Sequence, residues 1–549
     1  MIARTPNMTD YESTRRSFAF EVPEYYNFAS YTIDGWARDR GKLAMIWTGE
    51  GADTLSLTFA HFSEASSRLA DALRSLGVQP GDRALLVASR IPEWWEALLG
   101  MIRAGVIPVP GTTLLTPKDF VYRANTAGAV AAFVDEANLA KLREVRDQCP
   151  TLKHIIVFGR ASSGAHAYDS LLAGRPTRYD GPRTKASDPC LIYFTSGTTG
   201  NQKMVLHTQA SYPLGHIVTG KFWLDLQPND LHWNLSDTGW AKAAWSSVFG
   251  PWQCGSAIFV NNATGKFSAA QTLRMLEEYP ITTLCGPPTA YRMLVLEPLE
   301  RFKPKALRHC VAAGEPLNPE VIDMWKRHTG MTIRDGYGQT ETVLLCGNFP
   351  PLDVKPGSMG KPSPGFDVAV IGDDLAPVPA GKEGDIAVRV VPTRPVGLFK
   401  EYWKNPAEMA KSFRGDWYIT GDRAFVDEDG YFWFVGRGDD VINSSGYRIG
   451  PFEVESALIE HPAVAESAVV ASPDEMRGEI VKAFVILAPG YTASDALAVE
   501  LQEHCKNLTA PYKYPREIEF VTELPKTISG KIRRVELRER EKAKKSSRW

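Results

Sequence analysis

The sequence predicts an α/β protein with a large first part and a small α+β unit at its C-terminal end. Three observations support this fold class. Helical and strand patterns alternate from the N-terminus to about residue 430, which is typical of α/β proteins. The pattern changes after Gly436, where two strands and two helices are expected within a short stretch. The length of 549 residues leaves room for several domains, at roughly 150 residues each.

The clearest α/β unit begins with a helix at 63–76. Its apolar side chains recur at helical spacing, with Ser63 placed to cap the start and Gly77 to end the helix. Apolar runs at 84–89 and 106–110 read as strands with a helical segment between them. This strand–helix–strand order predicts parallel pairing. Similar strand signals recur further along the chain, at 155–158 and 258–260.

The last part of the chain predicts a separate small domain of ordinary size. Strands are expected at 466–472 and 481–489, and helices near 453–460 and 496–507. The preceding join, Gly-Arg-Gly-Asp-Asp at 436–440, is glycine-rich and charged, as a hinge would be. We therefore expect a first domain at 1–436, a hinge at 437–440 and a second domain at 441–549. The charged run from Arg538 to Lys545 predicts a solvated helix end or a frayed tail.

Composition and charge exclude several classes of protein. The net charge of −2 gives no bulk attraction to nucleic acid or to an anionic membrane. No run approaches ~18 uninterrupted apolar residues, so we expect no membrane-spanning helix. The seven cysteines are scattered without CxxC spacing, which predicts reduced thiols and no structural zinc. The N-terminus has no apolar signal core, so we expect a cytoplasmic protein, with a short organellar presequence left open.

A phosphate cradle is predicted directly after the apolar run 191–194. Gly197 and Gly200 permit backbone angles at which consecutive N–H groups point at one anion. Hydroxyl side chains lie around them, and Lys203 closes the loop with a positive charge. The glycine spacing is not that of a Walker A loop, which argues against a P-loop kinase. A polar surface turn is the alternative, but the preceding strand and the lysine favour phosphate binding.

Three later clusters carry polar groups of matching chemistry. Residues 335–342, DGYGQTET, lie between two β-prone segments and offer a hydroxyl and a carboxylate, and residues 312–320 precede them. In the segment 417–458, Asp422 can accept ribose hydroxyls and Arg437 can bond sugar and phosphate oxygens. The last cluster, 524–534, contains Lys531. Taken alone, each of these charges would be read as an ordinary surface residue.

The four clusters, in this order, resemble the adenylate-forming superfamily of acyl-CoA synthetases, luciferases and peptide-synthetase adenylation domains. The resemblance covers nearly the whole chain and is closest to the AMP-forming medium-chain acyl-CoA synthetases. It extends to three further segments, 236–245 (SDTGWAKAAW), 442–458 and 510–516. It implies a large N-terminal domain of α/β subdomains with mixed sheets. A small mobile α+β C-terminal domain would carry the catalytic lysine.

The resemblance also implies roles for individual residues. ATP contacts are implied for Thr195, Ser196, Gly197, Thr198, Thr199, Gly200, Lys203, Gly314, Glu315, Pro316, Asp335, Gly336, Tyr337, Gly338, Gln339, Thr340, Asp422, Arg437 and Lys531. Lys531, Lys203 and Glu341 would be catalytic, with Glu341 holding Mg²⁺. The small domain would turn about Asp439. CoA contacts are implied for Ser445, Gly446, Tyr447, Arg448, Arg477, Lys506 and Tyr514, with a solvated basic surface as the alternative.

The implied reaction joins a carboxylic acid to CoA in two half-reactions. The carboxylate attacks the α-phosphorus of ATP to give an acyl-adenylate and pyrophosphate, and the CoA thiol then displaces AMP. Positioning and charge stabilisation would carry the first step. An adenylation enzyme serving a carrier protein, a short-chain CoA ligase and a non-catalytic nucleotide sensor are the alternatives. The sequence leaves the oligomeric state open, a homodimer included.

The acyl pocket is predicted from one position. Acetyl-CoA synthetases resemble this motif but carry tryptophan where this chain has Gly338. Without the indole, a deeper slot would take longer or aromatic acids, and each buried methylene contributes ~0.8 kcal/mol. Trp240 and Trp245 are expected to form an aromatic wall of this slot. The preferred acid is left open.

Overall fold

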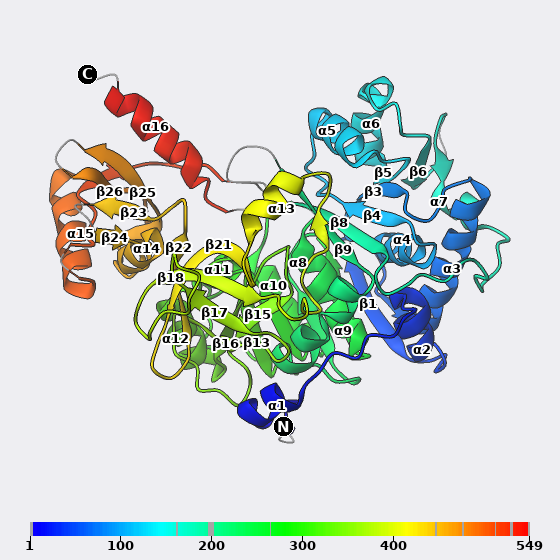
Figure 1. Ribbon diagram of the computed structural model, residues 1–549, viewed down its shortest axis with the longest axis horizontal. Helices are drawn as coiled ribbons and strands as arrows, with labels where there is room; N and C mark the ends of the chain where they lie inside the picture. Colours follow the sequence, from blue (N-terminus) through cyan, green and yellow to red (C-terminus); the bar gives the residue numbers. More distant parts are fainter. Residues whose placement is uncertain are drawn as a thin grey trace.

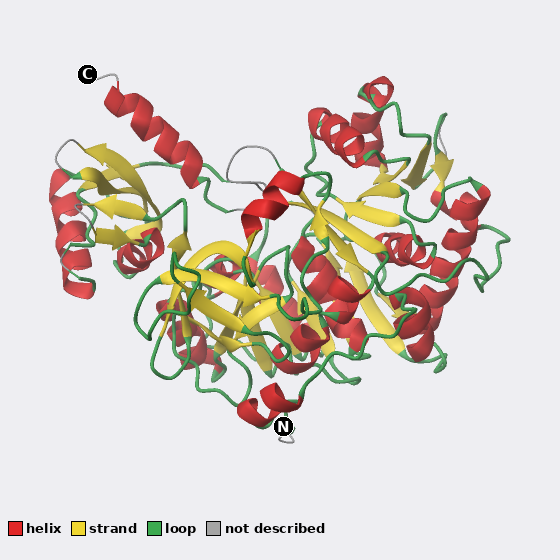
Figure 2. Cartoon of the chain, viewed as in Figure 1, coloured by secondary structure: helices red, strands yellow, loops and turns green. Residues whose placement is uncertain are grey.

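The computed structural model describes residues 4–160, 163–195, 202–263, 265–444, 447–474, 477–510, 512–526 and 531–546. A large unit precedes a small one, which lies at one end of the molecule in orange and red (Figure 1). Figure 2 shows that helices flank the strands in both units. The chain is therefore a mixed α/β protein, and the fold class predicted from the sequence is confirmed.

The first sheet is parallel throughout and has the strand order β4-β3-β5-β6-β7. Its strands are β3 (Arg83–Val87), β4 (Ile107–Pro110), β5 (Ala131–Asp135), β6 (His154–Phe158) and β7 (His166–Ala167). The accompanying helices are α3 (Phe59–Ser75), α4 (Pro92–Arg103), α5 (Pro117–Ala127), α6 (Glu136–Glu144) and α7 (Tyr168–Leu172). The predicted strand–helix–strand unit is confirmed as β3–α4–β4, with β3 and β4 parallel.

The predicted cap of α3 is wrong. The helix begins one turn earlier, where the side-chain oxygen of Thr58 accepts a hydrogen bond from the backbone N–H of His61 (3.2 Å). Phe59 and Phe62 are both buried and extend the apolar face upstream, so Ser63 lies inside the helix. Its hydroxyl donates instead to Asp34 Oδ1 (2.6 Å).

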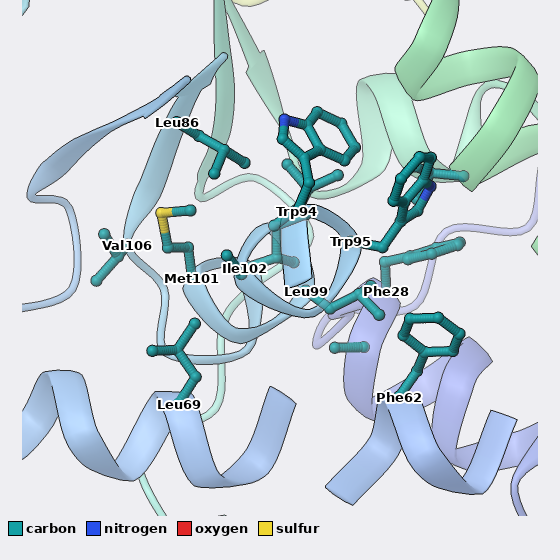
Figure 3. Close-up of a cluster of buried hydrophobic side chains, with 14 of the residues drawn as sticks. Phe28, Phe62, Leu69, Leu86, Trp94, Trp95, Leu99, Met101, Ile102 and Val106 are labelled. Carbon is teal, nitrogen blue, oxygen red and sulfur yellow. The ribbon is translucent and has the colours of Figure 1, made fainter. Parts of the chain in front are cut away.

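The core beside the first sheet is built around α4, which is buried on nearly all sides. Figure 3 shows Trp94, Trp95, Leu99 and Ile102 of this helix among side chains from α3, from β3 and from Phe28. A Cβ on Gly100 would lie 2.6 Å from the side chain of Leu69. Glycine at this position therefore permits the close approach of α3 and α4.

The largest sheet is mixed, as the resemblance implied, and it runs through the centre of the large unit. Its path is β17-β18-β21-β22-β16-β15-β14-β13-β12-β10-β11-β1-β2, with β20 pairing β21. Pairing is parallel from β1 through β11, β10, β12 and β13 to β14, and antiparallel from β14 to β17. The pairing changes from parallel to antiparallel at β14, which contains the first residues of the cluster 335–342.

The strands of this sheet are β1 (Leu43–Gly49), β2 (Leu55–Thr58), β10 (Leu231–Asn234), β11 (Ala257–Asn262), β12 (Thr283–Gly286), β13 (His309–Ala313), β14 (Ile333–Gly338), β15 (Leu344–Gly347), β16 (Ser358–Pro362), β17 (Val368–Ile371), β18 (Gly384–Arg389), β20 (Phe413–Arg414), β21 (Trp417–Val426) and β22 (Phe432–Arg437). The other helices of the large unit are α1 (Tyr11–Ser17), α2 (Asp34–Trp36), α8 (Ala241–Ala244), α9 (Gly250–Gln253), α10 (Ala269–Glu278), α11 (Pro288–Leu294), α12 (Pro319–Thr329) and α13 (Pro406–Ser412).

A three-stranded antiparallel sheet contains the two strands that lie between β7 and β10 in the sequence, together with one strand from later in the chain. It has the order β19-β9-β8, with β8 (Pro189–Thr195), β9 (Lys203–Thr208) and β19 (Glu401–Tyr402). The predicted phosphate loop connects β8 to β9, so it is the tip of a hairpin. Pairing with β19 brings Glu401 and Tyr402 beside Leu206 and Val205 in the middle of β9.

The small unit has its own sheet, of order β24-β23-β26-β25 with β27 pairing β26. Its strands are β23 (Ile442–Ser444), β24 (Tyr447–Ile449), β25 (Val464–Asp474), β26 (Gly478–Leu487) and β27 (Glu517–Phe520). Its helices are α14 (Pro451–Ile459), α15 (Asp495–Leu508) and α16 (Arg534–Ser546). The large sheet ends with β22 at Arg437 and the small sheet begins at Ile442, which is the topology that a hinge at 437–440 would need.

The charged C-terminal run is not a frayed tail. It lies in α16, where Glu541 is buried and accepts from Lys482 Nζ (2.6 Å) and from Ser472 (3.0 Å). Both partners belong to the sheet of the small unit. The charges of this helix are therefore partly structural, which a charge pattern alone does not reveal.

The seven cysteines lie in different elements, and all seven thiols are free. Six are buried and Cys254 is half-buried. Burial raises the pKa of every one of these thiols. Across the described ranges, no three His, Cys, Asp or Glu side chains gather as a metal site. In the same ranges, no helix combines the length and apolar character needed to cross a bilayer.

Candidate active site

Thr195 and Lys203 are paired across β8 and β9 and flank the predicted phosphate loop. The loop residues Ser196, Gly197, Thr198, Thr199 and Gly200 lie outside the described residues. The Lys203 ammonium forms a half-buried ion pair with Glu408 of α13 and lies 5.2 Å from the ring centroid of Tyr402. The cation predicted to meet phosphate thus already has an acidic partner.

Glu341 is linked to the same group of residues through Tyr402. The Tyr402 hydroxyl donates to Glu341 Oε1 (2.9 Å), and the Glu341 carbonyl accepts from the backbone N–H of Phe399 (2.8 Å). Burial raises the pKa of the Glu341 carboxyl, while the Tyr402 hydrogen bond and the charges of Lys203 and Arg437 act against that shift. One hard carboxylate, linked through Tyr402 to Lys203 at the end of the predicted phosphate loop, fits Mg²⁺, which commonly takes one or two protein carboxylates plus phosphate oxygens and water.

The DGYG part of the second cluster lies inside a strand. Asp335, Gly336, Tyr337 and Gly338 belong to β14, and a Cβ on Gly336 would lie 2.5 Å from the Trp223 ring. Asp335 is 4% exposed, and burial raises the pKa of its carboxyl to about 8. Hydrogen bonds from the backbone N–H groups of Gly336 and Leu317 act against this rise. The carboxyl is therefore mostly protonated at neutral pH.

Gln339 and Thr340 continue the chain beyond β14. Gln339 Nε2 donates to Asp422 Oδ2 (2.6 Å) and to the Thr420 carbonyl (3.0 Å). The Thr340 carbonyl accepts from Nε2 of His207 (2.7 Å), whose pKa burial lowers to about 3. A neutral, fully buried imidazole therefore fixes the turn that leads from β14 to Glu341.

Asp422 and Arg437 lie opposite each other on β21 and β22. Asp422 is buried, and its Oδ2 also accepts from the Tyr337 hydroxyl (2.7 Å). Its Oδ1 is 3.8 Å from Arg437 Nε. Burial raises the pKa of the Asp422 carboxyl, and Arg437 opposes that shift most strongly. A carboxylate fixed by three neighbours and placed beside a half-exposed guanidinium can accept the hydroxyls of a ribose.

The segment after β13 presents Gly314, Glu315 and Pro316. Gly314 has a φ of +101°, which favours glycine. Glu315 accepts from the Thr289 hydroxyl (2.6 Å) and lies 3.4 Å from an Arg292 nitrogen. Its carboxylate is therefore held in place from α11.

Lys531 of the small unit lies within electrostatic reach of this cluster. Surrounding protein lowers the pKa of its ammonium by desolvation, although the residue as a whole is exposed. Glu315 and Asp422 favour its charged form and Arg437 opposes it. The structure thus brings residues from three of the sequence clusters and the C-terminal lysine into one electrostatic neighbourhood.

The expected hinge lies beside this neighbourhood. Arg437 Nε is 3.8 Å from Asp439 Oδ1, and the next residue, Asp440, pairs with Arg538 of α16. Arg534 of the same helix makes a bidentate pair with the buried Glu455 (2.8 and 2.6 Å). These contacts tie the helix that follows Lys531 to the chain that follows Asp439.

The residues predicted to contact CoA form separate pairs on the small unit. Tyr447 is exposed and stacks on Tyr512 with centroids 4.4 Å apart. Lys506 lies 4.3 Å from the ring centroid of Tyr514, and the backbone N–H of Arg477 donates to Asp474 Oδ1 (2.9 Å). The backbone of Arg448 lies in β24. Ser445 and Gly446 are outside the described residues.

The position that suggested a deep acyl slot has a structural role as well. A Cβ on Gly338 would lie 2.5 Å from the carbonyl oxygen of Val343. Any side chain here therefore needs a shift of the backbone between β14 and β15. Trp245 stacks on His216 (6.0 Å) and packs against two hydrophobic cores, while Trp240 is half-buried at the start of α8.

Sequence reasoning missed three residues of this region, Glu408, Tyr402 and Lys242. Glu408 lies 205 positions from its partner Lys203, and neither it nor Tyr402 stands in a recognisable motif. Lys242 did carry a signal, because it is a lone cation in the apolar run AKAAW. Its ammonium donates to the carbonyl of Ala313, at the end of β13.

Both the large and the small unit match known protein families. Residues 34–403 match the family described as AMP-binding enzyme, and residues 453–531 match the AMP-binding enzyme C-terminal domain. The chain is 48% identical to the mitochondrial acyl-coenzyme A synthetase ACSM3 of Mus musculus over 549 residues, covering 98% of this chain and 94% of the relative.

The solved structures with the same fold at 30% identity or more include two ligases of named acids. One is the anthranilate CoA ligase AuaEII in complex with anthranoyl-AMP, with a TM-score of 0.88 and 32% identity, covering 96% of this chain and 99% of the other. The second is a benzoate CoA ligase from Burkholderia xenovorans LB400, with a TM-score of 0.82 and 30% identity, covering 93% and 100%.

The expected cytoplasmic location is wrong. The ACSM3 proteins of Mus musculus, Rattus norvegicus and Homo sapiens are all named as mitochondrial, which points to the mitochondrion instead. The expectation came from the lack of an apolar signal core. That criterion detects secretion, whereas mitochondrial addresses are Arg- and Ser-rich amphipathic segments without such a core.

Proposed function

The chain belongs to the AMP-binding enzyme family and is an AMP-forming acyl-CoA synthetase, and we propose that it uses the residues described above to activate a medium-chain or aromatic acid. The observation that carries the residue assignment is the position of Lys531. Lys531 of the small unit lies within electrostatic reach of Asp422, Arg437 and Glu315 of the large unit. A cation at that point suits a reaction in which a carboxylate attacks a phosphate.

In the first half-reaction the carboxylate of the acid attacks the α-phosphorus of ATP. Asp422 and Arg437 would hold the ribose, and the hairpin with Thr195 and Lys203 would hold the outer phosphates. Lys531 would lie between the carboxylate and the α-phosphate and offset their charge. Mg²⁺, bound near Glu341, would offset the charge that develops on pyrophosphate. No protein base is required, since the nucleophile is already ionised.

Lys203 has to change partners for this step. In the structure its ammonium is paired with Glu408 and lies over the Tyr402 ring. Phosphate oxygens would replace Glu408 as its partner. Tyr402 would then still hold Glu341, because that hydrogen bond is independent of the ion pair.

In the second half-reaction the CoA thiol attacks the acyl carbonyl and AMP leaves. We place the pivot at Asp439, between the domain at 1–436 and the domain at 441–549. Arg538 and Arg534 would make α16 and the chain after Asp439 move together, so that Lys531 leaves as the small domain turns. The pairs Tyr447–Tyr512 and Lys506–Tyr514 offer stacking and positive charge for the nucleotide end of CoA.

Two observations support the proposal of a medium-chain or aromatic acid. Two structural neighbours are named as ligases of aromatic acids, anthranilate and benzoate. In addition, this chain has Gly338 where the acetyl-CoA synthetases that it resembles carry tryptophan. Both favour an acid larger than acetate.

Pyrophosphate release should be measured with ATP and Mg²⁺ across acetate, butyrate, hexanoate, octanoate, benzoate and phenylacetate, with and without CoA. We expect turnover that requires CoA and is highest for an acid larger than acetate. Release that ignores CoA would indicate transfer to a carrier protein, and a maximum at acetate would reject the proposed acid class. Lys531→Ala should abolish the adenylation half-reaction; near wild-type exchange in that variant would reject the assignment of Lys531.

A further inference from the structure

Lys242 is a lysine with no part in the mechanism above, although it lies at the same site. It is half-buried on α8, and its ammonium donates to the carbonyl of Ala313. A Cβ on the next residue, Gly314, would lie 3.2 Å from the Lys242 nitrogen. The ammonium therefore lies against the backbone that leads to Glu315.

The charges around Lys242 do not balance. Its ionisable neighbours are Cys285, Glu315, Lys531 and Asp335. Burial raises the pKa values of the Cys285 thiol and of the Asp335 carboxyl, the latter to about 8, so both are largely neutral at pH 7. Glu315 is the remaining anion of this set, and it also faces Arg292 and Lys531.

Glu315 is thus shared by three cations, of which Lys531 also has Asp422 as an acidic neighbour. Burial lowers the pKa of Lys242, and Lys531 lowers it further, because two nearby ammonium groups disfavour each other's charge. A second carboxylate arriving between them would relieve this repulsion. ATP does not supply that group, whereas the acid substrate does.

We propose that Lys242 binds the carboxylate of the acid from the large unit while Lys531 approaches it from the small unit. This inference rests on the proposed function and names a further substrate-binding residue for it. Lys242 would bind the free acid and lose this interaction once the acyl-adenylate forms, because the acyl carbonyl then carries no full charge. Its effect is confined to acid binding and the first half-reaction.

The test uses the full chain and the acid with the fastest pyrophosphate exchange. Lys242→Met removes both charge and donor, whereas Lys242→Gln removes the charge and keeps a donor for the Ala313 carbonyl. Lys141→Met is the matched control. Lys141 lies on α6, beside the first sheet. It is also half-buried, and its ammonium donates to the backbone carbonyl of Thr113 (2.8 Å).

Both Lys242 variants should raise the KM for the acid roughly 10- to 100-fold, the range for a lost hydrogen bond between charged groups. The KM for ATP should stay within about twofold, and the control should match the wild type. The primary amide of the same acid, tested as a competitive inhibitor, should keep its affinity in all variants because it carries no charge. Thiolation of supplied acyl-adenylate should be unchanged.

An unchanged KM for the acid in both Lys242 variants would overturn the proposal. So would equal losses for acid, amide and ATP, since these would mean that Lys242 only supports the backbone at Ala313. Wild-type exchange is measured first. If no acid in the panel supports it, the proposed function fails before Lys242 is tested, and the two failures remain distinct.

Discussion

Asp335 provides a prediction whose sign and size follow directly from its burial. The carboxyl is 4% exposed, and burial raises its pKa from 3.8 to about 8. Between these values the folded chain keeps a proton that the unfolded chain releases. The free energy of unfolding therefore falls as pH rises, by about 1.4 kcal/mol per pH unit. From pH 5 to pH 7 this single group costs about 3 kcal/mol.

Asp335→Asn removes the titrating group and keeps a side chain of similar shape. We expect a constant offset from altered hydrogen bonding with Gly336 and Leu317, plus a difference that grows with pH. The melting temperature of the variant minus that of the wild type should rise by several degrees from pH 5 to pH 7, at roughly 2 °C or less per kcal/mol for a chain of this size. Above pH 8 the difference should level off, because the native carboxyl is then ionised too.

Differential scanning calorimetry of the two proteins at half-unit pH steps measures this difference. Four buried histidines, His207, His216, His232 and His309, also have lowered pKa values, so their contribution to stability increases as pH rises toward 6.5. They are present in both proteins and cancel in the subtraction. A difference that stays constant from pH 5 to pH 8 would refute the reasoning and would also remove the neutral Asp335 from the charge balance at Lys242.

Three further predictions concern single contacts. Glu408→Gln removes the acidic partner of Lys203 and frees its ammonium for phosphate; because a partly exposed ion pair contributes on the order of 1 kcal/mol, the KM for ATP should fall about fivefold. An equal or higher KM for ATP would contradict the exchange of partners. Tyr337→Phe removes a donor to Asp422 and should raise the KM for ATP roughly tenfold without changing that for the acid; a parallel rise in both would argue against a role in ribose binding. Gly338→Ala places a Cβ 2.5 Å from the Val343 carbonyl oxygen and should lower the free energy of unfolding by ~1–3 kcal/mol, seen as a lower melting temperature. The control Gly35→Ala, with open space around it, should not lower it, and equal melting temperatures for the two variants would show that the backbone yields easily.

Local features of the fold could be predicted well because they depend on neighbouring residues. The strand–helix–strand unit ending at Pro110 follows from apolar runs and is present as β3–α4–β4. The start of α3 was missed because Phe59 and Phe62 continue its buried face beyond Ser63. The strand character of DGYG was hidden by its glycines. These residues pair with β13 and β15, and Gly336 is needed because the Trp223 ring leaves no room for a side chain.

The site could be predicted only where its residues stand in motifs. Asp422, Arg437 and Lys531 were found by order and spacing, and the structure brings them together with Glu315. Glu408 was not found, because a contact across 205 positions depends on the pairing of β9 with β19.

The seven protected thiols make this chain suitable for site-specific labelling. With six buried cysteines, one half-buried and all with raised pKa values, little thiolate is available to a maleimide dye. A cysteine introduced at Leu296 of the large unit (80% exposed) and another at Val499 of the small unit (56% exposed) would therefore take up nearly all of the label. Energy transfer between two such dyes would report the distance between the units in single molecules, before and after CoA is added, in an otherwise unmodified background.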